Sequence, residues 1–149
     1  MTADDQYNLE RFVRAQDADG TYARVLVELR AGRKTGHWMW FVFPQIAGLG
    51  RSETSRRYAI ASLTEAAAYL QHPRLGPRLI ECAQIVEASS ALSATQILGP
   101  IDAKKLQSCM TLFMRAVPAE LLFARVLERY FAGAPDHNTD RLLQSQADE

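Results

Sequence analysis

The residues best suited to bind a ligand or take part in a reaction lie between positions 33 and 52, where positive charge is combined with aromatic rings. Arg33 and Arg51 can neutralise a phosphate group, and the face of Trp38 can stack on a planar base. His37, the imidazole beside that tryptophan, can transfer protons near neutral pH, although a hydrogen-bonded structural histidine is the more common outcome. These residue types suggest a site for an anionic, nucleotide-like small molecule, with Trp38 a candidate ligand contact and His37 a candidate catalytic residue.

The same segment contains a Gly-x-Gly-x-Ser pattern, made by Gly48, Gly50 and Ser52 with Arg51 between the last two. Glycines permit backbone conformations closed to other residues, and a helix N-terminus exposes unpaired N–H groups that bind anions. The full Gly-x-Gly-x-x-Gly motif and a preceding strand are both absent, so an ordinary turn is the alternative. These four residues are therefore candidate ligand contacts.

Two later segments add polar candidates. In a predicted amphipathic helix, Lys105 lies at the border of the apolar face and Ser108 lies on the polar face, and both are candidate ligand contacts. The polar face consists of Lys104, Ser108, Thr111 and Arg115. We expect this face as a whole to be solvated. Asp136 is a second candidate for proton transfer, with helix capping as the more ordinary interpretation.

The charge balance limits the classes of partner. Seventeen basic and seventeen acidic residues cancel, which argues against non-specific nucleic-acid binding by the whole surface. Residues 30–60 nevertheless contain six basic residues and one acidic residue. This local excess is compatible with a phosphorylated small-molecule ligand. The alternative function is a non-catalytic interaction module that meets an acidic partner, possible also as a homodimer.

No reaction or cofactor is indicated by a motif. The three histidines, His37, His72 and His137, have no second ligand at metal spacing, so we predict no metal site and no cofactor. A serine-hydrolase elbow and a phosphate-binding loop with a lysine are both absent from the sequence. The sequence leaves open whether the protein is an enzyme.

The remaining composition predicts a cytoplasmic protein. Cys82 and Cys109 stand alone within apolar helical patterns and are expected to be buried, reduced thiols. Residues 1–10 lack the features of a secretory signal. The longest apolar run, residues 38–43, is far shorter than the roughly 20 residues that span a bilayer.

Helical periodicity with short connections predicts an all-α fold, a single compact multi-helix domain over residues 1–149 with an ordered core at about 8–143. Expected helix caps are Asn8, Thr21, Ser52, Ser62, Ser93 and Asp102. The best-defined helix follows Asp102, and its apolar stripe consists of Leu106, Met110, Phe113 and Val117.

The aromatic segment at 36–46 does not fit that periodicity, because its apolar residues are continuous. A lone strand there would have no partner for its hydrogen bonds, so we expect a short helix or a buried irregular turn. Trp40, Phe41 and Phe43 are assigned to the core.

Two stretches in this region, His-Trp-Met-Trp-Phe-Val-Phe-Pro-Gln at 37–45 and Gly-Leu-Gly-Arg-Ser at 48–52, resemble the hallmark of the bacterial family known as domain of unknown function 1810. The resemblance continues through 72–79, 105–113 and 130–133. It implies a mainly helical single domain and brings no established activity. It also draws attention to polar residues that packing alone does not demand, which include His37, Gln45, Ser52, Lys105, Ser108, Thr111 and Asp136.

Overall fold

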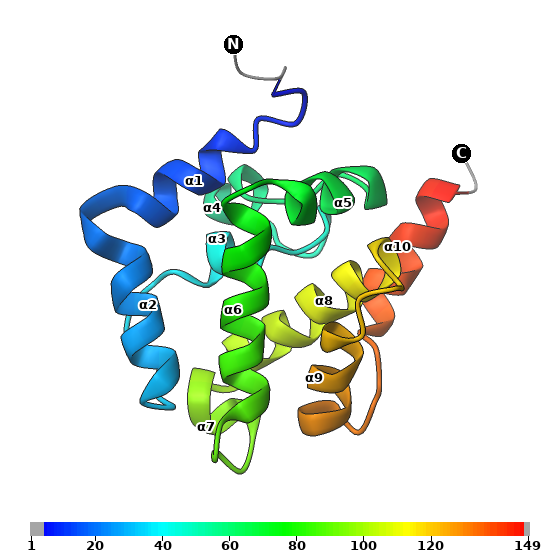
Figure 1. Ribbon diagram of the computed structural model, residues 1–149. Helices are drawn as coiled ribbons and strands as arrows, with labels where there is room; N and C mark the ends of the chain where they lie inside the picture. The colour runs from blue at the N-terminus through cyan, green and yellow to red at the C-terminus, as the bar shows by residue number, and fades with distance from the viewer. Residues whose placement is uncertain (1–4, 148–149) are drawn as a thin grey trace.

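Helices separated by short connections make up most of the computed structural model, which describes residues 5–147 (Figure 1). In chain order they are α1 (Glu10–Asp17), the 3-10 turn η1 (Ala18–Gly20), α2 (Thr21–Arg30), α3 (Met39–Val42), α4 (Glu53–Arg57), α5 (Leu63–Gln71), α6 (Leu75–Ala88), α7 (Ala94–Leu98), α8 (Pro100–Ala116), α9 (Leu122–Phe131) and α10 (His137–Ala147). Within the described residues the only β-type pairing is an isolated bridge between Ile46 and Ile60. The all-α prediction is confirmed.

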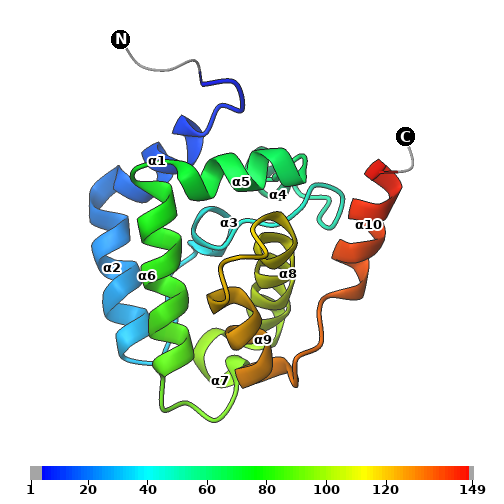
Figure 2. The same cartoon turned by 45° about the vertical axis from the view of Figure 1, so that its right-hand side comes forward.

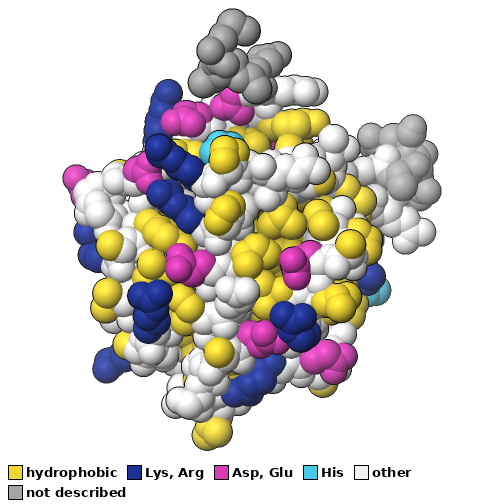
Figure 3. Space-filling view, in the orientation of Figure 1, with side chains coloured by type: hydrophobic (Ala, Val, Ile, Leu, Met, Phe, Trp, Pro, Cys, Tyr) yellow, Lys and Arg dark blue, Asp and Glu magenta, His cyan; other side chains and the backbone are white. Residues whose placement is uncertain are grey.

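Helix α8 organises the fold. It packs against α5, α7, α9 and α10, while α6 packs against α2, α5 and α9 (Figures 1 and 2). The short helix α3 is held between α1 and α6. No helix within residues 5–147 is both long enough and apolar enough to cross a membrane. On the face seen in Figure 3, basic and acidic side chains are interspersed, as expected for a chain without net charge.

The apolar stripe of α8 forms the centre of the core. Leu106, Met110 and Phe113 are fully buried, which confirms this part of the prediction, whereas Val117 lies beyond the helix end and is half-buried. The Phe113 ring centroid lies 5.4 Å from that of Tyr69 on α5 and 5.7 Å from that of Phe123 on α9. Full burial of each large apolar side chain stabilises the fold by about 1.5–3 kcal/mol.

Three of the predicted caps are confirmed. The hydroxyls of Ser52, Ser62 and Ser93 accept hydrogen bonds from backbone N–H groups in the first turns of α4, α5 and α7, at distances of 3.0–3.1 Å. Each serine therefore satisfies an N–H group that the helix itself leaves unpaired. Gly32, with φ +71°, follows Ala31 at the end of α2, where a glycine in the left-handed region commonly terminates a helix.

The predicted cap at Asn8 is wrong. Asn8 has a left-handed backbone with φ +51°, and its side chain does not cap α1. Asp5 performs this role instead, because its carboxylate accepts hydrogen bonds from the backbone N–H groups of Leu9 and Glu10 at 2.7 and 3.1 Å.

The predicted caps at Thr21 and Asp102 are also wrong. The Thr21 hydroxyl donates a hydrogen bond to the carbonyl of Ala18 at 2.6 Å and accepts none from a backbone N–H group of α2. Asp102 lies inside the first turn of α8, where its carboxylate pairs with Lys34 and Lys105. Thr21 thus bonds a carbonyl that precedes α2, and Asp102 bonds two lysines; neither side chain caps a helix.

The aromatic segment adopts the short helix α3 followed by irregular chain, as expected. Its apolar side chains differ in burial, since Phe43 is fully buried while Trp40 and Phe41 keep partial exposure. Ile60 donates a backbone hydrogen bond to the Gln45 carbonyl at 2.8 Å and accepts one from Ala47 at 2.8 Å. This pairing satisfies backbone groups of the irregular chain, and the sequence pattern did not predict it.

Candidate functional site

A cleft of about 390 Å³ opens between the loop that follows α3, the N-terminal half of α8 and the start of α10. We call it the Trp40 cleft. It is lined by Trp40, Gln45, Leu49, Gly50, Ile101, Lys104, Lys105, Ser108, Asp136 and Asn138. Its volume lies within the range of roughly 300–1,000 Å³ that is usual for small-molecule sites.

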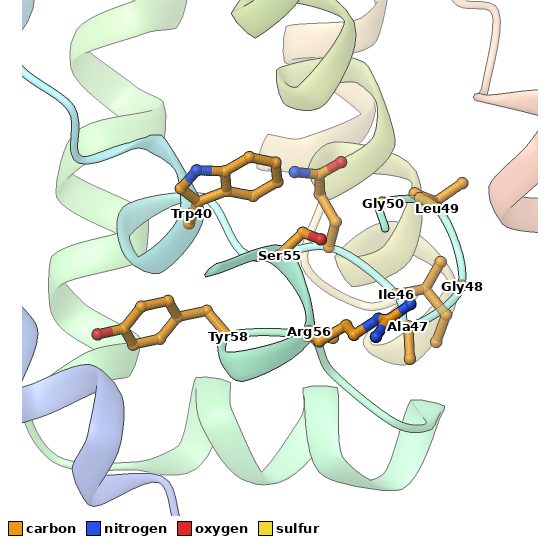
Figure 4. Close-up of a pocket in the computed structure, with 11 residues that line it drawn as sticks. Trp40, Ile46, Ala47, Gly48, Leu49, Gly50, Ser55, Arg56 and Tyr58 are labelled. Carbon is orange, nitrogen blue, oxygen red and sulfur yellow. The ribbon is translucent and has the colours of Figure 1, made fainter. Parts of the chain in front are cut away.

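A smaller hollow of about 120 Å³ adjoins the cleft and shares Trp40, Gln45, Leu49 and Gly50 with it. The other residues that line the hollow are Ile46, Ala47, Gly48, Ser55, Arg56, Tyr58 and Ala59. Figure 4 shows the Trp40 ring on one side of this hollow, with Ser55 beneath it and the loop of Gly48 and Gly50 opposite. Together the two cavities form a continuous concave surface around Trp40.

Two glycines allow the loop to approach its neighbours closely. Gly48 has φ +104°, and a Cβ atom there would lie 3.2 Å from the Leu142 side chain on α10. A Cβ atom on Gly50 would lie 2.6 Å from the Ser55 hydroxyl on α4. These contacts hold the loop between α4 and α10, and Figure 2 shows the chain passing between these two helices. Close packing of the loop explains both glycines without an anion.

The Lys105 ammonium is held inside the cleft by two neighbours. Its Nζ atom lies 3.7 Å from the centroid of the Trp40 ring and 3.1 Å from Oδ1 of Asp102. Oδ2 of Asp102 pairs with Lys34 at 2.8 Å. Burial alone would raise the pKa of Asp102, but the Lys34 and Lys105 ammonium groups outweigh it and hold this pKa below its ordinary value. The cluster is therefore ionised, and its two ammonium groups and one carboxylate leave a net positive charge beside the cleft.

Asp136 closes the opposite side of the cleft, and it is only 1% exposed. Its Oδ2 atom accepts three hydrogen bonds, from the Ser108 hydroxyl at 3.0 Å, the Thr139 backbone N–H at 3.0 Å and the Thr139 hydroxyl at 2.6 Å. The backbone bond from Thr139 confirms the capping interpretation for Asp136. The backbone N–H of Asp136 in turn donates to the Thr111 hydroxyl at 2.7 Å.

These bonds correct the expectation of a solvated polar face on α8. Ser108 and Thr111 are buried because the start of α10 packs over them, whereas Lys104 and Arg115 remain exposed. The sequence pattern could not reveal this, since Asp136 is 28 residues from Ser108.

The second oxygen of Asp136 has a different environment. Oδ1 is inaccessible to solvent and accepts no hydrogen bond within the described residues. The Lys104 ammonium lies 3.1 Å from Oδ1 as an ion pair, and it also donates a hydrogen bond to the Gln107 side chain at 3.1 Å. Burial alone would raise the pKa of Asp136, yet Thr139, the Lys104 ammonium and Ser108 outweigh it and hold this pKa below its ordinary value. Asp136 is therefore an anion at neutral pH, suited to accept hydrogen bonds.

Of the residues selected from sequence, the structure brings together Gly50, Lys105, Ser108 and Asp136 in the Trp40 cleft. Gly48 lines the adjoining hollow. These residues come from three separate parts of the chain, so their grouping depends on how α8, α10 and the loop pack.

Other selected residues lie outside the cleft. Trp38 is buried, and its indole N–H donates to the Glu28 carboxylate at 2.9 Å. Arg33 and His37 are exposed on the connection before α3, and neither lines the cleft or the hollow. The fold therefore does not form the predicted pocket between Trp38, His37 and Arg33.

The Gly-x-Gly-x-Ser pattern lacks the geometry of an anion site. Helix α4 has only five residues, and Ser52 already caps its N-terminus. Arg51 is exposed and lines neither cavity. The pattern is explained by a capped short helix and a closely packed loop.

The sequence interpretation missed several residues that line these cavities: Trp40, Gln45, Leu49, Arg56 and Lys104. Trp40 had been assigned to the core, and Lys104 to a solvated face. Gln45 carried a usable signal, because it belongs to the polar residues of the motif at 37–45.

Metal and thiol chemistry have no visible basis in the site. Residues 5–147 contain no group of three or more His, Cys, Asp or Glu side chains placed to hold a metal ion. Cys82 and Cys109 are buried, unpaired thiols, as predicted. Burial raises the pKa of Cys82 to about 12 and that of Cys109 well above its ordinary value, so both thiols are poor nucleophiles.

Comparison with known proteins gives two matches. A family profile described as "Protein of unknown function (DUF1810)" matches residues 6–143. The crystal structure of the conserved hypothetical protein Rv1873 from Mycobacterium tuberculosis shares 52% sequence identity, covers 94% of this chain and 99% of its own, and superposes with a TM-score of 0.90. No curated protein matches the chain.

Proposed function

Because this chain belongs to the family described as protein of unknown function (DUF1810), its function has to be inferred from its own residues, and we propose that it binds a small, anionic, nucleotide-like molecule in the Trp40 cleft. One observation carries the proposal: an aromatic face, ammonium groups and a buried carboxylate surround a single cavity. Such a mixture of apolar wall and few convergent polar groups is typical of small-molecule sites.

The apolar wall suits a planar group. Trp40 and Leu49 line both the cleft and the adjoining hollow, and Ile46 and Tyr58 extend the hydrophobic surface of the hollow. Stacking of a base on an aromatic side chain contributes about 1–3 kcal/mol. A base that stacks on Trp40 would also contact the apolar side chains beside it.

The cations suit a phosphate or another anion. Lys104 and Lys105 line the cleft, and Arg56 lines the hollow. Lys105 is already balanced by Asp102, and Lys104 is paired with Asp136, so each gives only part of its charge to a ligand. Arg56 forms no ion pair within the described residues and can contribute its full charge.

The proposal concerns binding and includes no reaction. A general base must lie within hydrogen-bond reach of the proton it removes. His37 does not line the cleft. Asp136 is a weak base because its pKa lies below the ordinary value. Its position suits recognition better than proton transfer.

Tryptophan fluorescence tests the proposal, because Trp40 lines the cleft while the other tryptophan, Trp38, is buried in the core. Adenosine monophosphate (AMP), adenosine and inorganic phosphate serve as probes. AMP is expected to quench the emission saturably and to raise the melting temperature. The quenching is expected to disappear in Trp40→Phe, which keeps an aromatic ring but lacks the reporter indole.

Two charge variants locate the anion. Lys105→Met removes a cation from the cleft and is expected to weaken AMP binding by about tenfold, in keeping with the 1.5–3 kcal/mol of a hydrogen bond to a charged group. Arg33→Ala removes one positive charge outside the cleft and is the matched control, with affinity unchanged. Failure of all three probes to bind would contradict the proposal and favour a non-catalytic interaction module.

A further inference from the structure

Among the described side chains, Oδ1 of Asp136 is the one buried polar atom that no donor meets in hydrogen-bond geometry, although the Lys104 ammonium lies 3.1 Å away as an ion pair. The other oxygen of the same carboxylate accepts three hydrogen bonds. A buried acceptor that lacks a donor costs about 1–3 kcal/mol, and more for a charged group. Native structures contain few such atoms, and they often mark a functional position.

Lys104 covers this oxygen and forms an ion pair with it, but not in hydrogen-bond geometry. The Lys104 side chain is 62% exposed, and its ammonium lies 3.1 Å from Oδ1 while its hydrogen bond is directed to Gln107. Only the lysine end of this pair is exposed, so the ammonium can turn into water, whereas the buried Oδ1 then needs a hydrogen-bond donor from the bound molecule. Asp136 and Lys104 both line the Trp40 cleft, so a bound molecule can reach the oxygen once Lys104 moves.

We infer that Oδ1 of Asp136 accepts a hydrogen bond from a sugar hydroxyl of the bound ligand, and that Lys104 occupies this position until the ligand displaces it. The inference rests on the proposed function and narrows the ligand class to nucleotides or sugar phosphates with free hydroxyl groups. Displaced from Asp136, the Lys104 ammonium becomes available to the anionic part of the same ligand.

The chemistry of the cleft favours a hydroxyl over other donors. A carboxylate in its ionised form can only accept hydrogen bonds, so the partner must present an O–H or N–H group. A cationic amine would enter beside Lys104 and Lys105 and be repelled by them. A neutral hydroxyl avoids this repulsion, and a sugar next to a base stacked at Trp40 brings it toward α8 and α10.

Matched probes test the hydroxyl. AMP and 2′,3′-dideoxy-AMP differ only in the two sugar hydroxyls, and calorimetry gives both affinities. The wild-type protein is expected to bind AMP about tenfold or more tightly than the dideoxy form, since a hydrogen bond to a charged acceptor is worth at least one decade of affinity.

Asp136→Asn tests the acceptor. Asparagine is as good a helix cap as aspartate, so the start of α10 is retained, which circular dichroism and the melting temperature verify. The variant is expected to lose its preference for AMP over dideoxy-AMP, because the amide NH2 group that replaces Oδ1 cannot accept a hydrogen bond. A wild-type preference that persists in Asp136→Asn would overturn the inference.

Lys104→Met tests the displacement. Adenosine carries the hydroxyls but no anion, so removal of the competing ammonium is expected to raise its affinity at least twofold. A weaker adenosine affinity would show that Lys104 supports the ligand, and would overturn the displacement. Equal wild-type binding of AMP and dideoxy-AMP would overturn the inference and leave the proposed function intact, whereas no binding of any probe would overturn both.

Discussion

Two carboxylates near α8, those of Asp102 and Asp136, have similar partners and different environments. Each oxygen of Asp102 pairs with its own ammonium group, that of Lys34 or that of Lys105, and the Lys34 side chain is only 8% exposed. Asp136 has one oxygen that accepts three hydrogen bonds and one that meets only the ammonium of the exposed Lys104.

This difference separates a structural ion cluster from a candidate binding position. At Asp102 both carboxylate oxygens are paired, so the cluster joins the connection before α3 to α8 and leaves no free acceptor for a ligand. At Asp136 the hydrogen bonds of Oδ2 hold the carboxylate in place while Oδ1 retains an unused acceptor. Ligand recognition requires a side chain that is held in place and still has a free hydrogen-bond acceptor.

The largest expected effect concerns the scaffold on which both carboxylates are held. Phe113→Ala removes a fully buried ring between α5, α8 and α9 and is expected to cost about 3–5 kcal/mol of unfolding free energy, because the cavity closes only in part. Urea unfolding measures this loss. A cost below about 1 kcal/mol would contradict the central position of α8 in the core.

The next effect tests the closed cluster. Lys34→Met leaves Asp102 with one cation instead of two, and loss of about 2–4 kcal/mol of unfolding free energy is expected, near the cost of breaking a buried ion pair. Arg125→Met is the matched control, since its pair with Glu87 is exposed and is worth about 1 kcal/mol or less. Similar losses in both variants would remove the distinction between closed and open pairs.

A smaller effect is expected from acid. The pKa of Asp136 in the folded protein lies below its ordinary value of 3.8, so its stabilising contribution is present above about pH 4 and is lost as the pH falls through the lower, folded pKa. The unfolding free energy of the wild-type protein should therefore fall below pH 4. Asp136→Asn should fall less steeply over the same range. Parallel pH curves would contradict the ionised state of Asp136.

The smallest effect is expected at Lys104. Lys104→Met removes an ammonium whose side chain is exposed, and the three hydrogen bonds to Oδ2 still hold the Asp136 carboxylate, so a loss of only about 1 kcal/mol of unfolding free energy is expected. The contrast with Lys34→Met, also a lysine bound to a carboxylate, would sharpen the comparison between the two sites. Equal destabilisation by both changes would show that the Asp136 pair is as structural as the Asp102 cluster.

Sequence patterns predicted the helices where neighbours along the chain decide the structure. Ser52, Ser62 and Ser93 were correctly placed as caps because the N–H groups they satisfy are three residues away. The apolar stripe of Leu106, Met110 and Phe113 was correct because helical periodicity puts these residues on one face.

The candidate site could be predicted only as separate residues. Ser108 and Asp136 were both selected from sequence, yet their hydrogen bond spans 28 positions and no local pattern connects them. Gly50 was selected for anion binding, whereas its packing against Ser55 explains it better. The sequence therefore identified several residues of the cleft correctly but gave some of them the wrong role.

The sequence by itself determined an all-α chain, the starts of α4, α5 and α7 and the buried face of α8, because these follow from interactions within a few residues. Only the tertiary structure decided between Trp38 and Trp40, which are two positions apart in one aromatic run. Trp38 turns into the core to bond Glu28, and Trp40 lines the cleft beside Lys105. The direction of each ring depends on which distant helices pack around the segment, and no local pattern contains that information.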